Sequence, residues 1–389
     1  MKMRIMLYGL GRGLESVKKK LKTEHKIIGY ADSFAKIKKY GGGVNFYELN
    51  KIKEIEFDYL IVTIQNCKEA WKVRNMLVNN YGINSEKVIP FYVYANRELW
   101  DIKMRTYDLE EIRGLIFGNS NAAYAFLEKE LSTPFVNFSV PSQDLYYEYQ
   151  VFCKCIRKYS KLLKNLEYII IDLYDYIEFN ADCSLSSNIL NYMYYGGIYS
   201  EHNFSKNNNF KNSLNQEMFM RYGIFLKKDF RNVWKELFAE EGSVLTLEVE
   251  NRWTHIEINE PLSTELLNGS IVKNRYDSTI NENKIILDNF IREIRKWNPH
   301  MKIILTLIPR YITMERITEQ ILLSWKIEFL NIVKGFCDQY NLYFFNYKYK
   351  KEISENHIFY ADIQHMNTIG GKALSAILDE DLKKIDISS

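Results

Sequence analysis

The stretch "GLIFGNSNAAYAFLEKEL", residues 114–131, decides the fold predicted for the larger part of the chain. An apolar run ends at Phe117, Gly118 permits a tight turn, and a helical pattern begins at about Asn121. The stretch therefore predicts a buried strand, a turn and a helix, as in a parallel sheet with covered faces. Functional groups collect at the carboxyl ends of such strands, and Ser120 stands at this point.

The same alternation continues on both sides of this stretch. Downstream, it predicts strands at 134–140, 168–176, 302–309 and 342–347, and helices at 146–165, 281–297, 324–340 and from Thr368 onward. Upstream, it predicts strands at 4–9, 26–32, 57–64 and 87–94, and helices at 13–24 and 68–82. Residues from about 183 to 278 are less regular, with the alternating runs "SVLTLEVE" and "THIEI". We expect an insertion there, with helices and a small hairpin.

These patterns predict an α/β protein of two domains. The first covers residues 1–95, a charged linker covers 96–112, and the second domain covers 113–389 with the insertion inside it. A chain of 389 residues that is 47% hydrophobic is long enough to bury two cores.

Charge and cysteine usage narrow the class of protein. The 52 basic and 49 acidic residues nearly balance, which gives no case for nucleic-acid binding. The five cysteines are odd in number and irregular in spacing, as in a protein with reduced thiols. The start has too short an apolar run for a signal peptide, and no run approaches the roughly 18 residues of a membrane helix. We expect a cytoplasmic protein without a membrane span.

A second motif, "FYADIQHMNTIGG" at 359–371, supplies a partner for the serine. Asp362 precedes His365 by three residues, so the carboxylate can orient the imidazole and His365 can accept the Ser120 proton. A serine at a helix start is also a favoured N-cap, and that alternative stays open for Ser120 taken alone.

At these residues the sequence resembles the SGNH (GDSL-type) hydrolase family, over roughly Leu115–Leu382 outside the insertion. "FYADIQHMNTIGGKALSAIL" is similar to the family's last block, and "FGNS" to its first, with Asn119 where the family usually has Asp. The "VNFSVP" run and the Thr279–Asn283 helix start resemble the branch that transfers acyl groups to polysaccharides and D-alanine to teichoic acids. The resemblance implies a three-layer α/β/α domain and a catalytic set of Ser120, Asp362 and His365.

The family's oxyanion-hole positions are altered in this chain. Ser142 or Ser139 occupies the region of the second block, where the family has a glycine. In "YIIIDLYDY", Tyr174 stands about where the family has its oxyanion-hole asparagine. Tyr174 or Asp175 can substitute for the missing side-chain donor of the oxyanion hole, or the backbone N–H groups of Ser120 and Ser142 can suffice.

The amino-terminal domain has its own candidate site in "YGLGRG". Gly9, Gly11 and Gly13 follow a strand, and Asp32 ends the next one about 20 residues on, a setting for dinucleotide or nucleotide-sugar binding. The third glycine is one position early, and about four strands are too few for a full dinucleotide fold. The domain resembles the short Rossmann-like domains that precede catalytic domains in bacterial sugar-modifying enzymes. A purely structural or dimerising domain with a glycine turn is the alternative.

The rest of the sequence contains no stronger candidate for a catalytic or binding site. None of the six histidines pairs with another at metal-ligand spacing on one helix face, so we expect no metal. The tyrosine-rich stretch 190–200 could stack on sugar rings or simply pack in the core.

The resemblance implies a function. We expect O-acyl transfer, with acetyl as the group, to a carbohydrate of a surface polysaccharide pathway, through an acyl-Ser120 intermediate. No tightly bound cofactor is expected, acetyl-CoA is a suitable acyl donor, and a homo-oligomer is compatible with the sequence. The alternatives are a carbohydrate O-acetyl esterase of the same fold and a non-catalytic protein that binds nucleotide-sugars or glycans.

Overall fold

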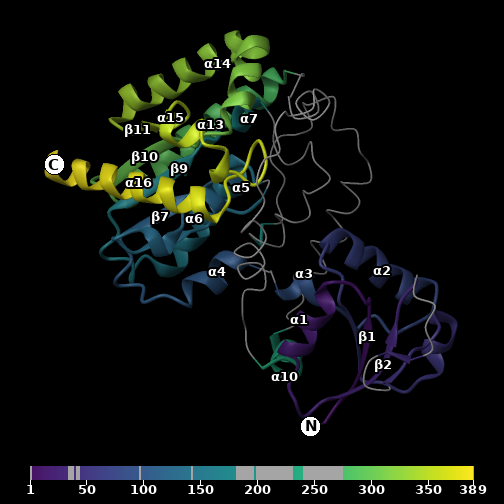
Figure 1. Cartoon of the computed structure of the whole chain (residues 1–389). Helices are drawn as coiled ribbons and strands as arrows, with labels where there is room; N and C mark the ends of the chain where they lie inside the picture. Colours follow the sequence, from purple (N-terminus) through teal and green to yellow (C-terminus); the bar gives the residue numbers. More distant parts are fainter. Residues whose placement is uncertain are drawn as a thin grey trace. The chain divides into compact units, whose positions relative to one another are not determined.

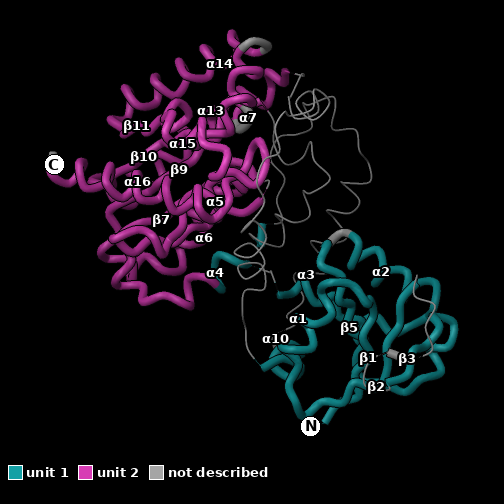
Figure 2. Tube along the Cα trace, viewed as in Figure 1, with its two compact units in different colours: residues 1–102, 190–199, 214–245 teal, residues 103–189, 200–213, 246–389 magenta. Residues whose placement is uncertain are grey.

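The computed structural model describes residues 2–33, 39–40, 44–95, 98–141, 143–180, 197–198, 231–239 and 275–388. These residues form two compact units, each built on a parallel sheet (Figure 1, Figure 2). Unit 1 comprises residues 1–102, 190–199 and 214–245, and unit 2 comprises 103–189, 200–213 and 246–389. The predicted α/β class is confirmed.

The sheet of unit 1 has four parallel strands. Their order is β2 (Lys26–Ala31), β1 (Arg4–Tyr8), β5 (Tyr59–Val62) and β6 (Val88–Pro90). The described elements that accompany it are α1 (Gly13–Lys20), α2 (Cys67–Asn79), α3 (Phe91–Ala95), α4 (Leu99–Met104), the 3-10 helix η2 (Leu49–Glu54) and the short pair β3 (Lys39–Tyr40) and β4 (Val44–Asn45).

The strand predicted over 87–94 is wrong in its second half. The strand ends at Pro90, and the chain turns into α3 at Phe91. Proline has no N–H to continue the ladder. All five residues of α3 are buried, and an apolar run of this length does not distinguish a strand from a buried helix.

Part of the predicted insertion belongs to unit 1. Helix α10 (Arg231–Leu237) lies beside the first unit's core, where Phe91 contacts Trp234 and Phe238 at ring-centroid distances of 5.2 and 5.0 Å. The predicted linker 96–112 also contains α4, and unit 1 extends to Ile102. The expected hairpin at "SVLTLEVE" and "THIEI" lies outside the described residues, as does the tyrosine-rich stretch except for Gly197 and Ile198.

Unit 2 is built on a five-stranded parallel sheet. The strand order is β11 (Tyr343–Asn346), β10 (Lys302–Leu307), β9 (Tyr168–Asp172), β7 (Gly114–Phe117) and β8 (Phe135–Asn137). β9 is central and buried along its whole length, as the apolar run "YIII" predicts. The strand predicted over 168–176 nevertheless ends at Asp172, and Tyr174 has a positive φ of 53°.

Helices cover both faces of this sheet. On one face, α5 (Ser120–Ala125) and α16 (Thr368–Ser388) share a core with alternate strand residues such as Ile116 and Ile170. On the other face, Phe117 contacts Phe152 of α6 (Leu145–Tyr159) and Phe290 of α13 (Asp277–Trp297). The remaining described helices are α7 (Ile177–Asn180), α14 (Ile312–Tyr340, kinked at Leu322), α15 (Lys351–Ser354), η3 (Glu128–Glu130) and η7 (His357–Phe359).

Candidate active site

The turn after β7 presents Ser120 at the first position of α5. The cap of this helix is Asn119, whose side chain accepts a hydrogen bond from the Asn121 N–H at 2.9 Å. Ser120 is therefore not the N-cap, and its hydroxyl is left for another partner. Gly118 is required in the turn, because a Cβ there would lie 2.7 Å from the Ala122 Cβ and 3.0 Å from the Asp172 Cβ.

The structure brings Ser120, His365 and Asp362 together. The Ser120 Oγ lies 2.9 Å from the Nε2 of His365, although 245 positions separate the two residues. The other imidazole nitrogen, Nδ1, lies 2.9 and 3.0 Å from the two Asp362 carboxylate oxygens. With the proton on Nδ1 donated to Asp362, Nε2 can accept the serine proton.

Asp362 is held ionised by its surroundings. Burial acts to raise its pKa, but the hydrogen bond and charge of His365 outweigh it, with help from the backbone N–H groups of Gln364 and His365. The net pKa lies below the ordinary value for aspartate. The carboxylate can therefore orient the imidazole and stabilise its cation.

The loop that carries the pair, residues 360–367 and here called the acid–base loop, is tied at its far end by Asn367. The Asn367 Nδ2 donates to the Ile358 carbonyl at 2.7 Å, and its Oδ1 accepts from the Ile369 and Gly370 N–H groups at 3.0 Å. Asn367 thus caps α16 and ties the loop to it. The edge of the Tyr124 ring packs against His365 at a centroid distance of 5.7 Å.

Of the two predicted oxyanion residues, Tyr174 alone belongs to the part of the chain that the structure describes. Ser142 lies outside the described residues. Tyr174 is buried against the charges of Arg310 and Lys348, 5.6 and 5.7 Å from its ring. Its hydroxyl makes no hydrogen bond to any described residue, and burial raises its pKa. Ser139 lies closer to the turn, since its Oγ is 3.4 Å from where a Gly118 Cβ would stand.

Two features near the site escaped the sequence analysis. Asp172, at the end of β9, is fully buried and accepts a hydrogen bond from the Thr306 hydroxyl at 3.1 Å. Burial raises its pKa to about 7, despite the opposing effect of the Thr306 hydrogen bond. The second feature is a set of buried charges around Arg310. Asp172 ends the apolar strand β9 and Arg310 lies three residues after β10, so a charged residue at the end of an apolar strand was the available signal.

In unit 1 the glycine turn and Asp32 lie together, as the motif predicts. Gly9 has a φ of 101°, and the Leu10 N–H donates to the Asp32 carboxylate at 3.0 Å. Gly13 lets α1 pack closely, because a Cβ there would be 2.2 Å from the Thr63 carbonyl oxygen. A Cβ on Gly11 would meet nothing within 4 Å.

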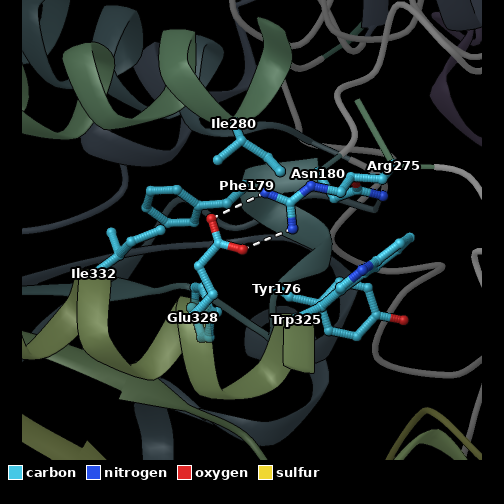
Figure 3. Close-up of a pocket in the computed structure, with 9 residues that line it drawn as sticks. Tyr176, Phe179, Asn180, Arg275, Ile280, Trp325, Glu328 and Ile332 are labelled. Carbon is cyan, nitrogen blue, oxygen red and sulfur yellow. Dashed lines mark hydrogen bonds and ion pairs between the residues drawn. The ribbon is translucent and has the colours of Figure 1, made fainter. Parts of the chain in front are cut away.

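Unit 2 also contains a small cleft lined by α7, α13 and α14 (Figure 3). Arg275 and Glu328 face each other across it in a two-point ion pair at 2.7 and 3.0 Å, among the aromatic rings of Tyr176, Phe179 and Trp325. Its free volume of about 20 Å³ holds about one water molecule. No motif in the sequence indicates this cleft, and we assign it no ligand.

Two further findings concern metals and membranes. Among the described residues, no three His, Cys, Asp or Glu side chains gather in a way that could hold a metal ion. None of the helices in that part of the chain is both long and apolar enough to cross a bilayer.

Comparison with known proteins gives one match. The family model described as "C2185-like, N-terminal" matches residues 1–89, the stretch from the start of unit 1 into β6. No curated protein matches the chain. The match covers less than a quarter of the 389 residues and does not include Ser120, Asp362 or His365.

Proposed function

We propose that unit 2 is a serine-dependent acyltransferase that moves an acyl group, acetyl by preference, onto a hydroxyl of a carbohydrate. The observation that carries the proposal is the hydrogen-bonded chain from the Ser120 Oγ through His365 to Asp362, with contacts of 2.9 to 3.0 Å. A nucleophile bonded to a base that a third group orients is the arrangement that activates serine for acyl transfer.

The chemistry follows from these positions. His365 Nε2 takes the Ser120 proton as Oγ attacks the acyl carbonyl, and then gives that proton to the leaving group. In the second half, the acceptor hydroxyl attacks the acyl-serine, His365 takes its proton, and Ser120 leaves as the hydroxyl. The backbone N–H of Ser120, in the first turn of α5, is one donor suited to the developing oxyanion.

The substrate assignment rests on the resemblance to SGNH acyltransferases. Acetyl-CoA would supply the acyl group, and a sugar of a surface polysaccharide would receive it. Water in place of the sugar would turn the same residues into a carbohydrate O-acetyl esterase.

The test uses an activated acetyl ester as donor. Wild-type protein should release the alcohol faster than buffer does, and an added carbohydrate acceptor should carry the acetyl group in mass spectrometry. Ser120→Ala should remove both effects, whereas Ser324→Ala, at an exposed site on α14, should keep them. If Ser120→Ala and wild type release the alcohol at the same rate, Ser120 is not the nucleophile.

For unit 1 we propose a nucleotide-sugar site at the glycine turn. It is supported by the N-terminus of α1, which favours phosphate, and by Asp32 at the end of β2. A bound nucleotide-sugar should raise the melting temperature of the full chain by mass action. Gly11→Val should erase the rise without lowering the unliganded melting temperature, because its Cβ meets no neighbour. No rise at millimolar ligand would leave this unit with a structural role.

A further inference from the structure

Four charged side chains are buried together at the carboxyl edge of the unit 2 sheet, and we call them the buried charge cluster. They are Arg310, Asp175, Glu315 and Lys348, with side chains exposed by 1 to 4%. Arg310 donates to Asp175 at 2.7 Å and to Glu315 at 2.8 Å. Lys348 donates to the same two carboxylates at 3.0 Å. Two positive and two negative charges therefore balance.

The cluster joins the chain segments that leave three neighbouring strands. Asp175 follows β9, Arg310 follows β10 and Lys348 follows β11, while Glu315 stands in the first turn of α14. Burial acts to raise the pKa of Glu315, but the charges of Lys348 and Arg310 lower it well below the ordinary value. The ion pairs thus hold all three segments to one point.

A contribution to the stability of the fold does not by itself explain why these four positions hold charged residues. Apolar residues of similar volume often stabilise a core as well as a buried ion network does, because desolvating the charges offsets their attraction. The Arg310 guanidinium also has a buried Nη1 without a hydrogen-bond partner among the described residues. What the charges add over an apolar core is a fixed direction and position for the backbone that carries them.

That backbone is bonded to the acid–base loop. The Tyr311 N–H donates to the Ile363 carbonyl at 3.3 Å, and the Tyr360 hydroxyl donates to the Pro309 carbonyl at 3.4 Å. The rings of Tyr311 and Tyr360 pack edge to face at 5.6 Å. The two neighbours of Arg310 therefore hold the loop on both sides of Asp362.

We propose that Arg310 is a positioning residue, which acts through Pro309 and Tyr311 to keep the acid–base loop within hydrogen-bond distance of Ser120. The inference rests on the proposed function for its kinetic consequence, but its geometric content stands apart from any activity. Misplacing a catalytic group by about 1 Å can cost about 10²-fold in rate, so a loosened loop should slow Ser120 chemistry measurably.

The test pairs a spectroscopic signal with a rate. The low-field proton NMR signal of the His365 Nδ1–H, identified by its loss in His365→Ala, reports the bond to Asp362. The rate of Ser120 labelling by a fluorophosphonate reports the complete arrangement. The main variant is Arg310→Met with Glu315→Gln, which removes one charge of each sign and leaves the Lys348–Asp175 pair intact.

We expect the double variant to lose or shift the His365 signal and to label Ser120 about 10- to 100-fold more slowly. The matched control is Arg275→Met, which breaks another two-point arginine–glutamate contact to α14 and should change neither readout. If the double variant does not fold, Arg310→Lys is read in the same way, since it keeps the charge but loses the planar fork.

The outcomes separate the two proposals. A folded variant with the wild-type His365 signal and labelling rate would overturn the role of Arg310 and leave the proposed function standing. A wild-type protein that is not labelled would defeat the proposed function. The NMR signal of His365 alone would then test the positioning role of Arg310. Loss of the signal in the double variant would support that role, and an unchanged signal would contradict it.

Discussion

Asn119 leaves the Ser120 hydroxyl available for chemistry. Because its side chain caps α5, the Ser120 hydroxyl is left to bond the His365 Nε2 at 2.9 Å. The sequence predicted the three members Ser120, Asp362 and His365 but left open whether the serine was only a cap. The answer depends on whether Asn119 or Ser120 accepts the capping hydrogen bond from the first turn of the helix, and both serine and asparagine are good caps.

Replacing the three hydrogen-bonded residues Ser120, His365 and Asp362 one at a time should reduce the labelling rate by unequal amounts. His365→Ala should reduce Ser120 labelling to the background seen with Ser120→Ala, since the two residues act as a unit. Asp362→Asn should cost less, about 10⁴-fold, because the imidazole remains but takes the wrong tautomer more readily. Labelling rates of purified variants at one pH measure this order. Full activity in His365→Ala would remove the base from the mechanism.

Asp172 should give stability a pH dependence of its own. Its pKa is raised by burial to about 7 in the folded protein, against about 3.9 in an unfolded chain. Between about pH 4 and pH 7 the unfolded chain loses this proton while the folded one keeps it, so stability falls as pH rises through that window and the penalty is constant above it.

Asp172→Asn removes this titration. Relative to wild type, the variant should gain about 3–4 kcal/mol at most in unfolding free energy between about pH 4 and pH 8. Urea unfolding of both proteins at the two pH values measures the difference. A difference between the proteins that does not change with pH would show that Asp172 is ionised in the fold.

At the level of elements, α16 depends on two glycines for its approach. A Cβ on Gly370 would lie 2.1 Å from the Phe359 carbonyl oxygen, and one on Gly371 would lie 2.3 Å from the Tyr124 carbonyl oxygen. In the structure the close contacts are with the chain before the acid–base loop and with α5.

Gly371→Ala should therefore force α16 away from α5, at a cost of about 1–3 kcal/mol in unfolding free energy. Gly335→Ala is the matched control, because Gly335 lies in α14 with nothing within 4 Å of its Cβ position. That change should stabilise the protein by about 0.5–1 kcal/mol, as alanine does in a helix interior. Denaturant unfolding measures both, and equal stability of Gly371→Ala and wild type would contradict the packing described.

The elements that the sequence predicted well are the buried strands and the longest periodic helices. β7, β10, β11 and α16 lie where apolar runs and helical periodicity indicate. α14 is longer than predicted and begins at Ile312. Its first turns were not predicted, because Pro309 and Tyr311 just before them obscure the helical pattern. The buried charge cluster was predictable only in part, since charged residues after the apolar strands are visible in the sequence but nothing in it shows that Asp175, Arg310 and Lys348 meet.

At the level of the whole molecule, the chain returns to unit 1 after entering unit 2. Residues 231–239 contribute Leu237 and Phe238 to the first core, and the Lys22 N–H donates to the Leu237 carbonyl at 3.0 Å. No pattern within these residues shows which of two sheets they pack against. Domain boundaries drawn along the sequence therefore missed this return.

Phe238→Ala should test whether residues 231–239 belong to the core of unit 1. Phe238 is 2% exposed, and deleting a buried phenylalanine side chain costs about 3–5 kcal/mol. Hydrogen exchange should become faster in β1 and β5 of unit 1 and stay unchanged in β7 of unit 2. Unchanged exchange in β1 and β5 would mean that residues 231–239 do not belong to that core.

The central claim, that Ser120 is a nucleophile activated by His365 and Asp362, is tested most directly by fluorophosphonate labelling followed by peptide mass spectrometry. This reagent reacts with activated serines and not with helix caps or ordinary surface hydroxyls. In the full-length protein we predict one phosphonylated peptide that contains Ser120, and no label in Ser120→Ala. Labelling that persists in Ser120→Ala, or a wild-type protein that takes up no label, would contradict the claim.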